Sequence, residues 1–148
     1  MGYWTVIEPY WEVVDIYAGP TEFLETFSAV PREAGLLLAA HWCQSEVCNG
    51  GFHQFFTNST GVLAPEALEG FAALGRLDLA ELLKSAMSFF GADYPREHEA
   101  RCRALSGRLG ATRKDWDPFY SGDDQFYACL RRQTFEEAAD IFTTARET

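Results

Sequence analysis

Basic residues are almost missing from the first half of this sequence. Residues 1–75 contain nine carboxylates and a single base, Arg32, whereas residues 76–148 contain thirteen carboxylates and eleven bases, so most of the formal net charge of −10 lies in the first half. A protein that binds nucleic acid contacts the phosphates with clustered lysine and arginine. The composition therefore argues against nucleic acid as a ligand. It favours either solubility or a basic partner protein.

Long apolar runs are missing too, since no stretch approaches the eighteen residues that a transmembrane helix requires. The N-terminal stretch MGYWTVIEPYWE has no basic region and places Glu8 and Pro9 where a signal peptide would be apolar. Four cysteines without a regular spacing are too few for a disulfide framework in a domain of 148 residues, so reduced and mostly buried thiols are expected. These absences predict a cytoplasmic protein.

Signals for β-strands are absent as well, because there is no long alternating run and no Asn-Gly hairpin between β-branched stretches. Apolar residues instead recur at helical spacings almost throughout. Residues 3–17 predict a first helix that begins or kinks near Pro9. Pro31 predicts the start of a central buried helix that ends at Gly50-Gly51. The sequence predicts one compact all-α domain over residues 1–148, with about eight or nine helices.

Residues 46–61, EVCNGGFHQFFTNSTG, form the most unusual stretch, and a metal site is the first interpretation to test. His41, Cys43, Cys48 and His53 have the spacing H-x-C-x4-C-x4-H, which suggests zinc. On a helix, however, His41 and Cys43 point about 200° apart, and His41 and Cys48 lie about 10 Å apart along the axis. One zinc ion needs its ligands within roughly 4 Å of one another. No metal or cofactor is therefore predicted. No catalytic residue is predicted either, because nothing in the sequence activates the thiol of Cys43 or Cys48 as a nucleophile.

A structural hinge explains more of this stretch. Gly50 and Gly51 are expected to adopt positive φ and to end the central helix. Glu46 is expected to accept hydrogen bonds from the N–H groups that the break frees. Three phenylalanines are expected to face the core, and three amides to bond other freed backbone groups: Phe52, Phe55 and Phe56, and Gln54, Asn58 and Asn49.

The same stretch resembles the signature of the bacterial DNA-mimic protein family of the DMP type, long filed as a domain of unknown function. The shared pattern is an acid followed by N-G-G-F, Q-F-F and N-S-x-G. The matching residues are Glu46, Asn49, Gly50, Gly51, Phe52, Gln54, Phe55, Phe56, Asn58, Ser59 and Gly61. The stretches APEALEGFAALG and LLKSAMSFFG also resemble family helices, and Asp124-x-Phe126-Tyr127 resembles the family's D-x-x-F-Y with a spacing one residue shorter.

This resemblance covers roughly residues 15–145. It implies an acidic, all-helical protein without known catalysis. It also implies that at least one branch of the family occupies the DNA site of a DNA-binding regulator. That role would depend on surface carboxylates rather than on the N-G-G-F motif, which maintains the fold.

The best candidates for such a surface are carboxylates of the N-terminal segment. Glu8, Glu12 and Asp15, at i, i+4 and i+7, are expected to form a stripe opposite the apolar face of the first helix. Glu22 and Glu25 are expected to continue the stripe onto the second helix. The spacing of about 5–6 Å is about threefold sparser than the charges of duplex DNA, which recur every ~1.7 Å of axis. A second element, Glu66 with Glu69, or a second subunit in a homodimer, is therefore required to extend the stripe.

Charge and resemblance together predict a non-enzymatic interaction protein whose acidic half binds a basic protein, such as a DNA-binding regulator. A solvated helix face that binds nothing explains the charge equally well. One alternative is a small-molecule or enzymatic pocket lined by Glu46, His53, Gln54 and Asn58. Another is a partner of the immunity or antitoxin type, which would use the same acidic surface against a different target.

Overall fold

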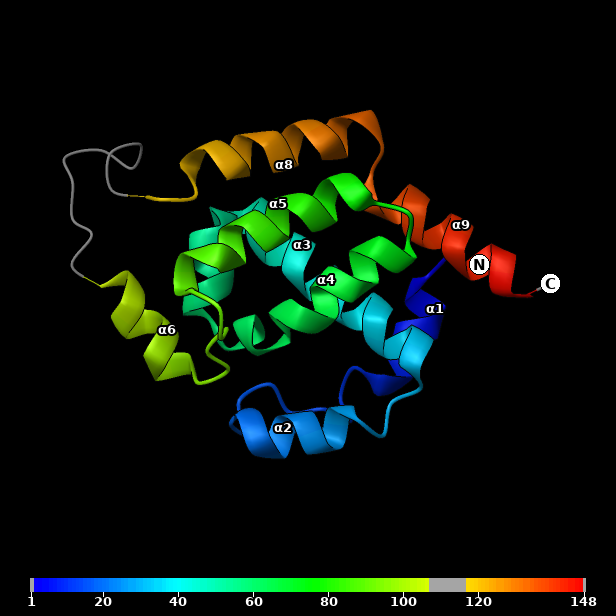
Figure 1. The fold of residues 1–148 in the computed structure, drawn as a ribbon. Helices are drawn as coiled ribbons and strands as arrows, with labels where there is room; N and C mark the ends of the chain where they lie inside the picture. Colours follow the sequence, from blue (N-terminus) through cyan, green and yellow to red (C-terminus); the bar gives the residue numbers. More distant parts are fainter. Residues whose placement is uncertain (1, 107–116, 148) are drawn as a thin grey trace.

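The computed structural model describes residues 2–106 and 117–147, and within these ranges the chain is helical without any strand (Figure 1). The elements, with η for 3-10 helices, are α1 (Trp4–Ile7), η1 (Glu8–Tyr10), α2 (Pro20–Phe27), α3 (Arg32–Thr57), η2 (Ser59–Leu63), α4 (Ala64–Ala73), α5 (Leu77–Met87), η3 (Ser88–Phe90), α6 (His98–Leu105), α8 (Tyr120–Arg132) and α9 (Phe135–Glu147). The predicted all-α class is confirmed.

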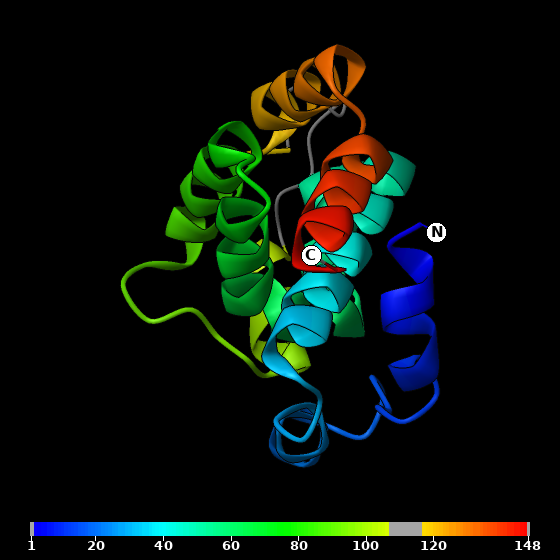
Figure 2. The same ribbon diagram turned by 90° about the vertical axis from the view of Figure 1, so that its right-hand side faces the viewer.

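Helix α3 is the centre of the fold, as the sequence predicts. It contacts α1, α4, α6, α8 and α9, and all its residues from Ala34 to Ala40 are buried. Figures 1 and 2 show the other helices arranged around it. Because an apolar surface on every side of a helix must be covered, the all-round apolar run of α3 places it inside.

The first helix is much shorter than the sequence predicts. α1 ends at Ile7, η1 continues only to Tyr10, and turns rather than helix follow as far as Gly19. Pro9 lies within η1, and because proline has no N–H to donate, it disfavours a continuous α-helix there. The Tyr3 N–H donates to Oδ1 of Asp140 at 2.7 Å, which ties the N-terminal segment to α9.

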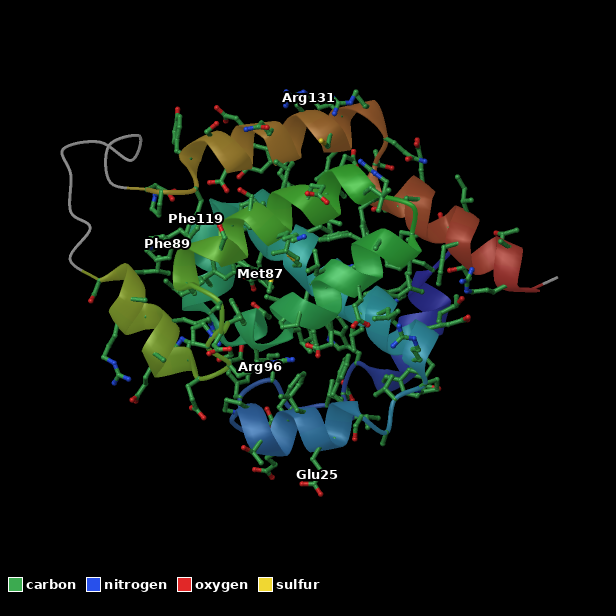
Figure 3. The ribbon with its side chains drawn as sticks, viewed as in Figure 1. Glu25, Met87, Phe89, Arg96, Phe119 and Arg131 are labelled. Carbon is green, nitrogen blue, oxygen red and sulfur yellow. The ribbon has the colours of Figure 1, made fainter. Side chains whose placement is uncertain are left out.

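Helices α2 and α8 lie at opposite ends of the molecule in both Figure 1 and Figure 2. α2 has Glu22 in its first turn and no base in its last turn, whereas α8 ends with Arg131 and Arg132. Figure 3 shows Glu25 on α2 pointing away from the molecule, at the end opposite Arg131. The charge asymmetry of the sequence is therefore also an asymmetry in space.

The four cysteines are free thiols, as expected, but only Cys43 and Cys129 are buried. Cys48 is exposed, and Cys102 is partly buried. Among the described residues, no group of three or more histidine, cysteine and carboxylate side chains is placed to hold a metal ion. In the described ranges, no helix is both long and apolar enough to cross a membrane.

Candidate functional site

The break in α3 falls at Gly50-Gly51, where the hinge is predicted. Gly50 has φ −151° and ψ 21°, and Gly51 has φ 78° and ψ 179°. Only Gly51 therefore adopts a positive φ, in a region that is essentially restricted to glycine, and the expectation for Gly50 is wrong. Gly50 is needed for space instead, because a Cβ there would lie 2.1 Å from Oε1 of Gln54.

The N–H group of Phe52, freed by the break, is bound by an acid from another helix. It donates to Oδ1 of Asp123 on α8 at 2.8 Å, and Asp123 is only 3 % exposed. Glu46 was expected to accept from freed N–H groups, and this expectation is wrong. Asp123, not Asp124, lies three residues before Phe126, so it completes the D-x-x-F-Y pattern with the full spacing.

The remaining residues of the D-x-x-F-Y pattern hold α8 against both sides of the break. The Tyr127 hydroxyl donates to the backbone carbonyl of Val47, before the break, at 2.8 Å. The Phe126 ring packs edge-on against that of Phe52, after the break, with ring centroids 5.4 Å apart. The break is thus fixed by residues about 75 positions later in the sequence rather than by its own flanks.

Glu46 forms a side-chain bridge across the break. Its Oε2 accepts from Nε2 of Gln54 at 2.9 Å and from Nδ2 of Asn58 at 2.8 Å. Nδ2 of Asn49 donates to Oε1 of Gln54 at 3.2 Å. The three amides therefore bond one another and Glu46, not the freed backbone groups as expected.

The end of the motif is held by a buried arginine that the sequence analysis missed. This residue is Arg101 on α6, and its side chain is fully buried. Its Nε donates to the carbonyl of Phe56 at 2.8 Å, and its Nη2 donates to that of Asn58 at 3.0 Å. A Cβ at Gly61 would lie 2.7 Å from Nε of Arg101, which explains the glycine in N-S-x-G. The guanidinium thus caps the carbonyl end of α3, where cations are favoured.

The motif accordingly builds the core. Phe52, Phe55 and Phe56 are fully buried, as predicted. Five of the clefts in the described part of the chain have volumes of 140–350 Å³, and none of these five is lined by Glu46, His53, Gln54 or Asn58. A ligand site is usually a concavity with a few polar groups at its wall. The geometry therefore favours a structural hinge over a ligand pocket.

Five carboxylates of the N-terminal segment are exposed, and none forms an ion pair with a described residue; we call them the acidic end: Glu8, Glu12, Asp15, Glu22 and Glu25. They do not form the expected helical stripe. Glu8 lies in η1, Glu12 and Asp15 lie in the turns before Gly19, and the other two lie on α2. Asp15 stabilises its own turn, because Oδ1 accepts from the Tyr17 N–H at 2.9 Å.

The expected extension of this surface onto α4 is neutralised by arginine. Glu66 pairs with Arg96 through two hydrogen bonds of 2.7 and 3.0 Å. Glu69 pairs with Arg32 at 3.3 Å. Because these carboxylates already have counter-ions, they add little negative potential to the acidic end.

Comparisons with known proteins identify a family for most of the chain. A family model described as DMP19-like protein matches residues 28–146. Comparison with curated proteins and with solved structures found no match. The matched span contains the break in α3, Asp123 and Arg101, but it begins three residues after Glu25 and so contains none of the acidic end.

Proposed function

The chain belongs to the DMP19-like protein family, and on that premise we propose that it is a non-enzymatic interaction protein. Its acidic end would occupy the DNA-binding surface of a basic DNA-binding or regulatory protein. The observation that carries the proposal is the set of five exposed carboxylates that lack ion pairs with the described residues; one of them, Glu25, lies at the end of the molecule opposite Arg131 (Figure 3).

The contrast with other carboxylates supports this assignment. Glu33, Glu66 and Glu69 each lie within 3.3 Å of an arginine, so their charge is largely offset. The carboxylates of the acidic end keep their full charge, and clustered charge of one sign accelerates association with an oppositely charged surface. A basic DNA-binding surface is such a target.

The density of negative charge on the acidic end limits how much of a DNA duplex it can imitate. Duplex DNA carries one charge per ~1.7 Å of axis, and five carboxylates distributed over turns and one helix are sparser than that. We therefore propose that the acidic end replaces a short run of phosphates in one contact region, or that a second copy of the chain extends the array. It is not expected to imitate a long duplex.

The test uses two triple variants of equal charge. One carries Glu8→Lys, Glu12→Lys and Asp15→Lys in the acidic end. The control carries three reversals at exposed positions elsewhere: Glu81→Lys, Asp124→Lys and Glu137→Lys. Three reversals of two units each take the net charge from −10 to −4 in both variants. Each immobilised protein is exposed to extract of its native cells at low and at high salt, and bound proteins are identified and then challenged with duplex DNA.

We expect the original chain and the control to retain a DNA-binding protein at low salt, to lose it at high salt and to release it when duplex DNA is added. The acidic-end variant should bind it at least about tenfold more weakly, since three lost contacts of about 0.5–1 kcal/mol each correspond to that factor. Equal binding of the two variants would contradict the acidic end as the interface. A salt-sensitive partner that DNA does not displace would contradict mimicry and favour an immunity-type partner.

A further inference from the structure

A small cleft with cationic walls lies beside the acidic end. It has a volume of about 140 Å³ and is bounded on one side by the turn from Ile16 to Pro20. The opposite wall includes Ser59 of η2 and three basic side chains, namely Arg96, His98 and Arg101. Figure 3 labels Arg96, which lies above α2 in that view. None of these residues serves the proposed DNA-mimic function.

Arg101 presents an incompletely satisfied charge to this cleft. A guanidinium has five N–H groups. Four of those of Arg101 donate to carbonyls, namely those of Phe56, Asn58, Pro95 and Arg96, at 2.6–3.2 Å. The remaining N–H, on Nη2, has no acceptor among the described residues. None of the four acceptors is a carboxylate, so within the described chain the buried charge has no directly bonded counter-ion.

Burial without a counter-ion is unfavourable for the charged form, and desolvation accordingly lowers the pKa of Arg101. An anion in the cleft would supply the missing opposite charge close to this guanidinium. Such an ion is the ligand that a fully buried, incompletely bonded guanidinium favours most.

Two other residues offer donors at the same wall. Arg96 uses Nη1 for the Val62 carbonyl and for Glu66, and Nη2 for Glu66, which leaves its Nε–H and one N–H on Nη2 without a partner in the described chain. The hydroxyl of Ser59 forms no hydrogen bond with any described residue. The ring of His98 is fixed through Nε2, which bonds the Thr57 carbonyl.

We propose that this cleft binds a small oxyanion, with the phosphoryl group as the preferred chemistry. Arginine forks match phosphate oxygens, and a hydroxyl donor adds a neutral contact. A volume of 140 Å³ equals about five water molecules at ~30 Å³ each, enough for one tetrahedral ion but too small for a nucleotide. The charge of −10 on the chain opposes the ion only over short distances, because the Debye length is about 8 Å at physiological salt.

Occupancy would connect α6 to the turn that carries the acidic end. Tyr17 and Gly19 line the cleft, and they lie between Asp15 and α2. An ion held between this turn and the basic wall would therefore fix the position of the acidic residues on either side of the turn. The site is independent of whether the acidic end imitates DNA.

The experiment measures thermal unfolding while inorganic phosphate replaces chloride at constant ionic strength. For a Kd on the order of 1 mM, about 10 mM phosphate should raise the Tm by about 3–6 °C. In Arg96→Gln the phosphate-induced rise should fall to near zero, and in Ser59→Ala the affinity should fall about three- to tenfold. Arg103→Gln, an exposed position on α6 two residues after Arg101, should behave as the original chain.

The phosphate-induced rise is compared within each variant, so the stability lost with the Arg96–Glu66 ion pair is subtracted, and Ser59→Ala tests the site without freeing the Glu66 carboxylate. Broadening of the phosphorus-31 resonance of phosphate by the original chain, but not by Arg96→Gln, provides a second readout. If phosphate raises the Tm equally in all variants, it stabilises the folded state in general, as salts excluded from the protein surface do. That result would overturn the proposed site. A parallel titration with O-phosphoserine identifies the source: equal affinity indicates a phosphoryl group on a larger molecule, and binding of inorganic phosphate alone indicates the free ion.

Discussion

Replacing Arg101 with methionine should destabilise the protein more than any exposed substitution on the same helix. The change removes four hydrogen bonds to the carbonyls of Phe56, Asn58, Pro95 and Arg96, at 2.6–3.2 Å, from a side chain that is fully buried. Methionine extends about as far as Nε and is apolar, so the change keeps the buried stem of the side chain and removes the guanidinium.

The magnitude is a difference between two large contributions. Hydrogen bonds from a charged donor contribute about 1.5–3 kcal/mol each, so four give a gross stabilisation of about 6–12 kcal/mol. Burial of the charge costs several kcal/mol, which leaves a net loss on removal of about 3–5 kcal/mol. For a chain of this size, that loss lowers the Tm by about 6–20 °C.

Urea unfolding followed by circular dichroism provides the measurement, and Arg103→Met is the matched control. Arg103 lies two residues away on α6 and is exposed, so its replacement should change the free energy of unfolding by no more than about 0.5 kcal/mol. If Arg101→Met and Arg103→Met have the same urea midpoint and slope, the carbonyl contacts contribute nothing and the reasoning is refuted.

Three further predictions concern the break in α3 and the N-terminal segment. Gly51→Ala should cost about 1–3 kcal/mol of unfolding free energy, because φ 78° with ψ 179° is a glycine conformation; an unchanged urea midpoint would contradict it. Asp123→Ala should cost at least about 1–3 kcal/mol and speed hydrogen exchange of the Phe52 amide, whereas Asp123→Asn, which keeps an acceptor, should recover part of the loss. Burial lowers the pKa of His41 below its ordinary 6.5, so the unfolded chain binds the proton more readily and stability should fall as the pH decreases below about 6.5. His41→Gln should lack that part of the pH dependence in urea titrations at several pH values.

Local features of the fold were predictable from the sequence because they depend on neighbouring residues. The break at Gly51, the burial of Phe52 and the start of α3 after Pro31 all follow from a glycine pair, a helical spacing and a proline. The start of α9 also depends on neighbouring residues, since the Glu137 N–H donates to the hydroxyl of Thr134, the residue before the helix, at 3.1 Å.

The groups that complete the break were not predictable in the same way. Asp123 lies 71 residues after Phe52, and Arg101 lies 45 residues after Phe56. The spacing of apolar residues in the sequence does not indicate such pairings, because they depend on how α6 and α8 pack on α3. The D-x-x-F-Y pattern was the one available signal for Asp123, and it was assigned to the adjacent Asp124. Arg101 gave no signal, because its helix reads as a polar surface.

The helices that hold the break in α3 and the acidic end are different parts of this chain. The family match covers residues 28–146, which include the residues that fix the break, whereas all five carboxylates of the acidic end precede it. Family membership therefore supports the fold of this protein directly. The proposed choice of partner depends instead on the charges that precede the matched span. Because the acidic end makes no ion pair with the rest of the described chain, its charges can change without disturbing α3. Members that share the break in α3 but carry other N-terminal charges should consequently keep the fold and bind different partners.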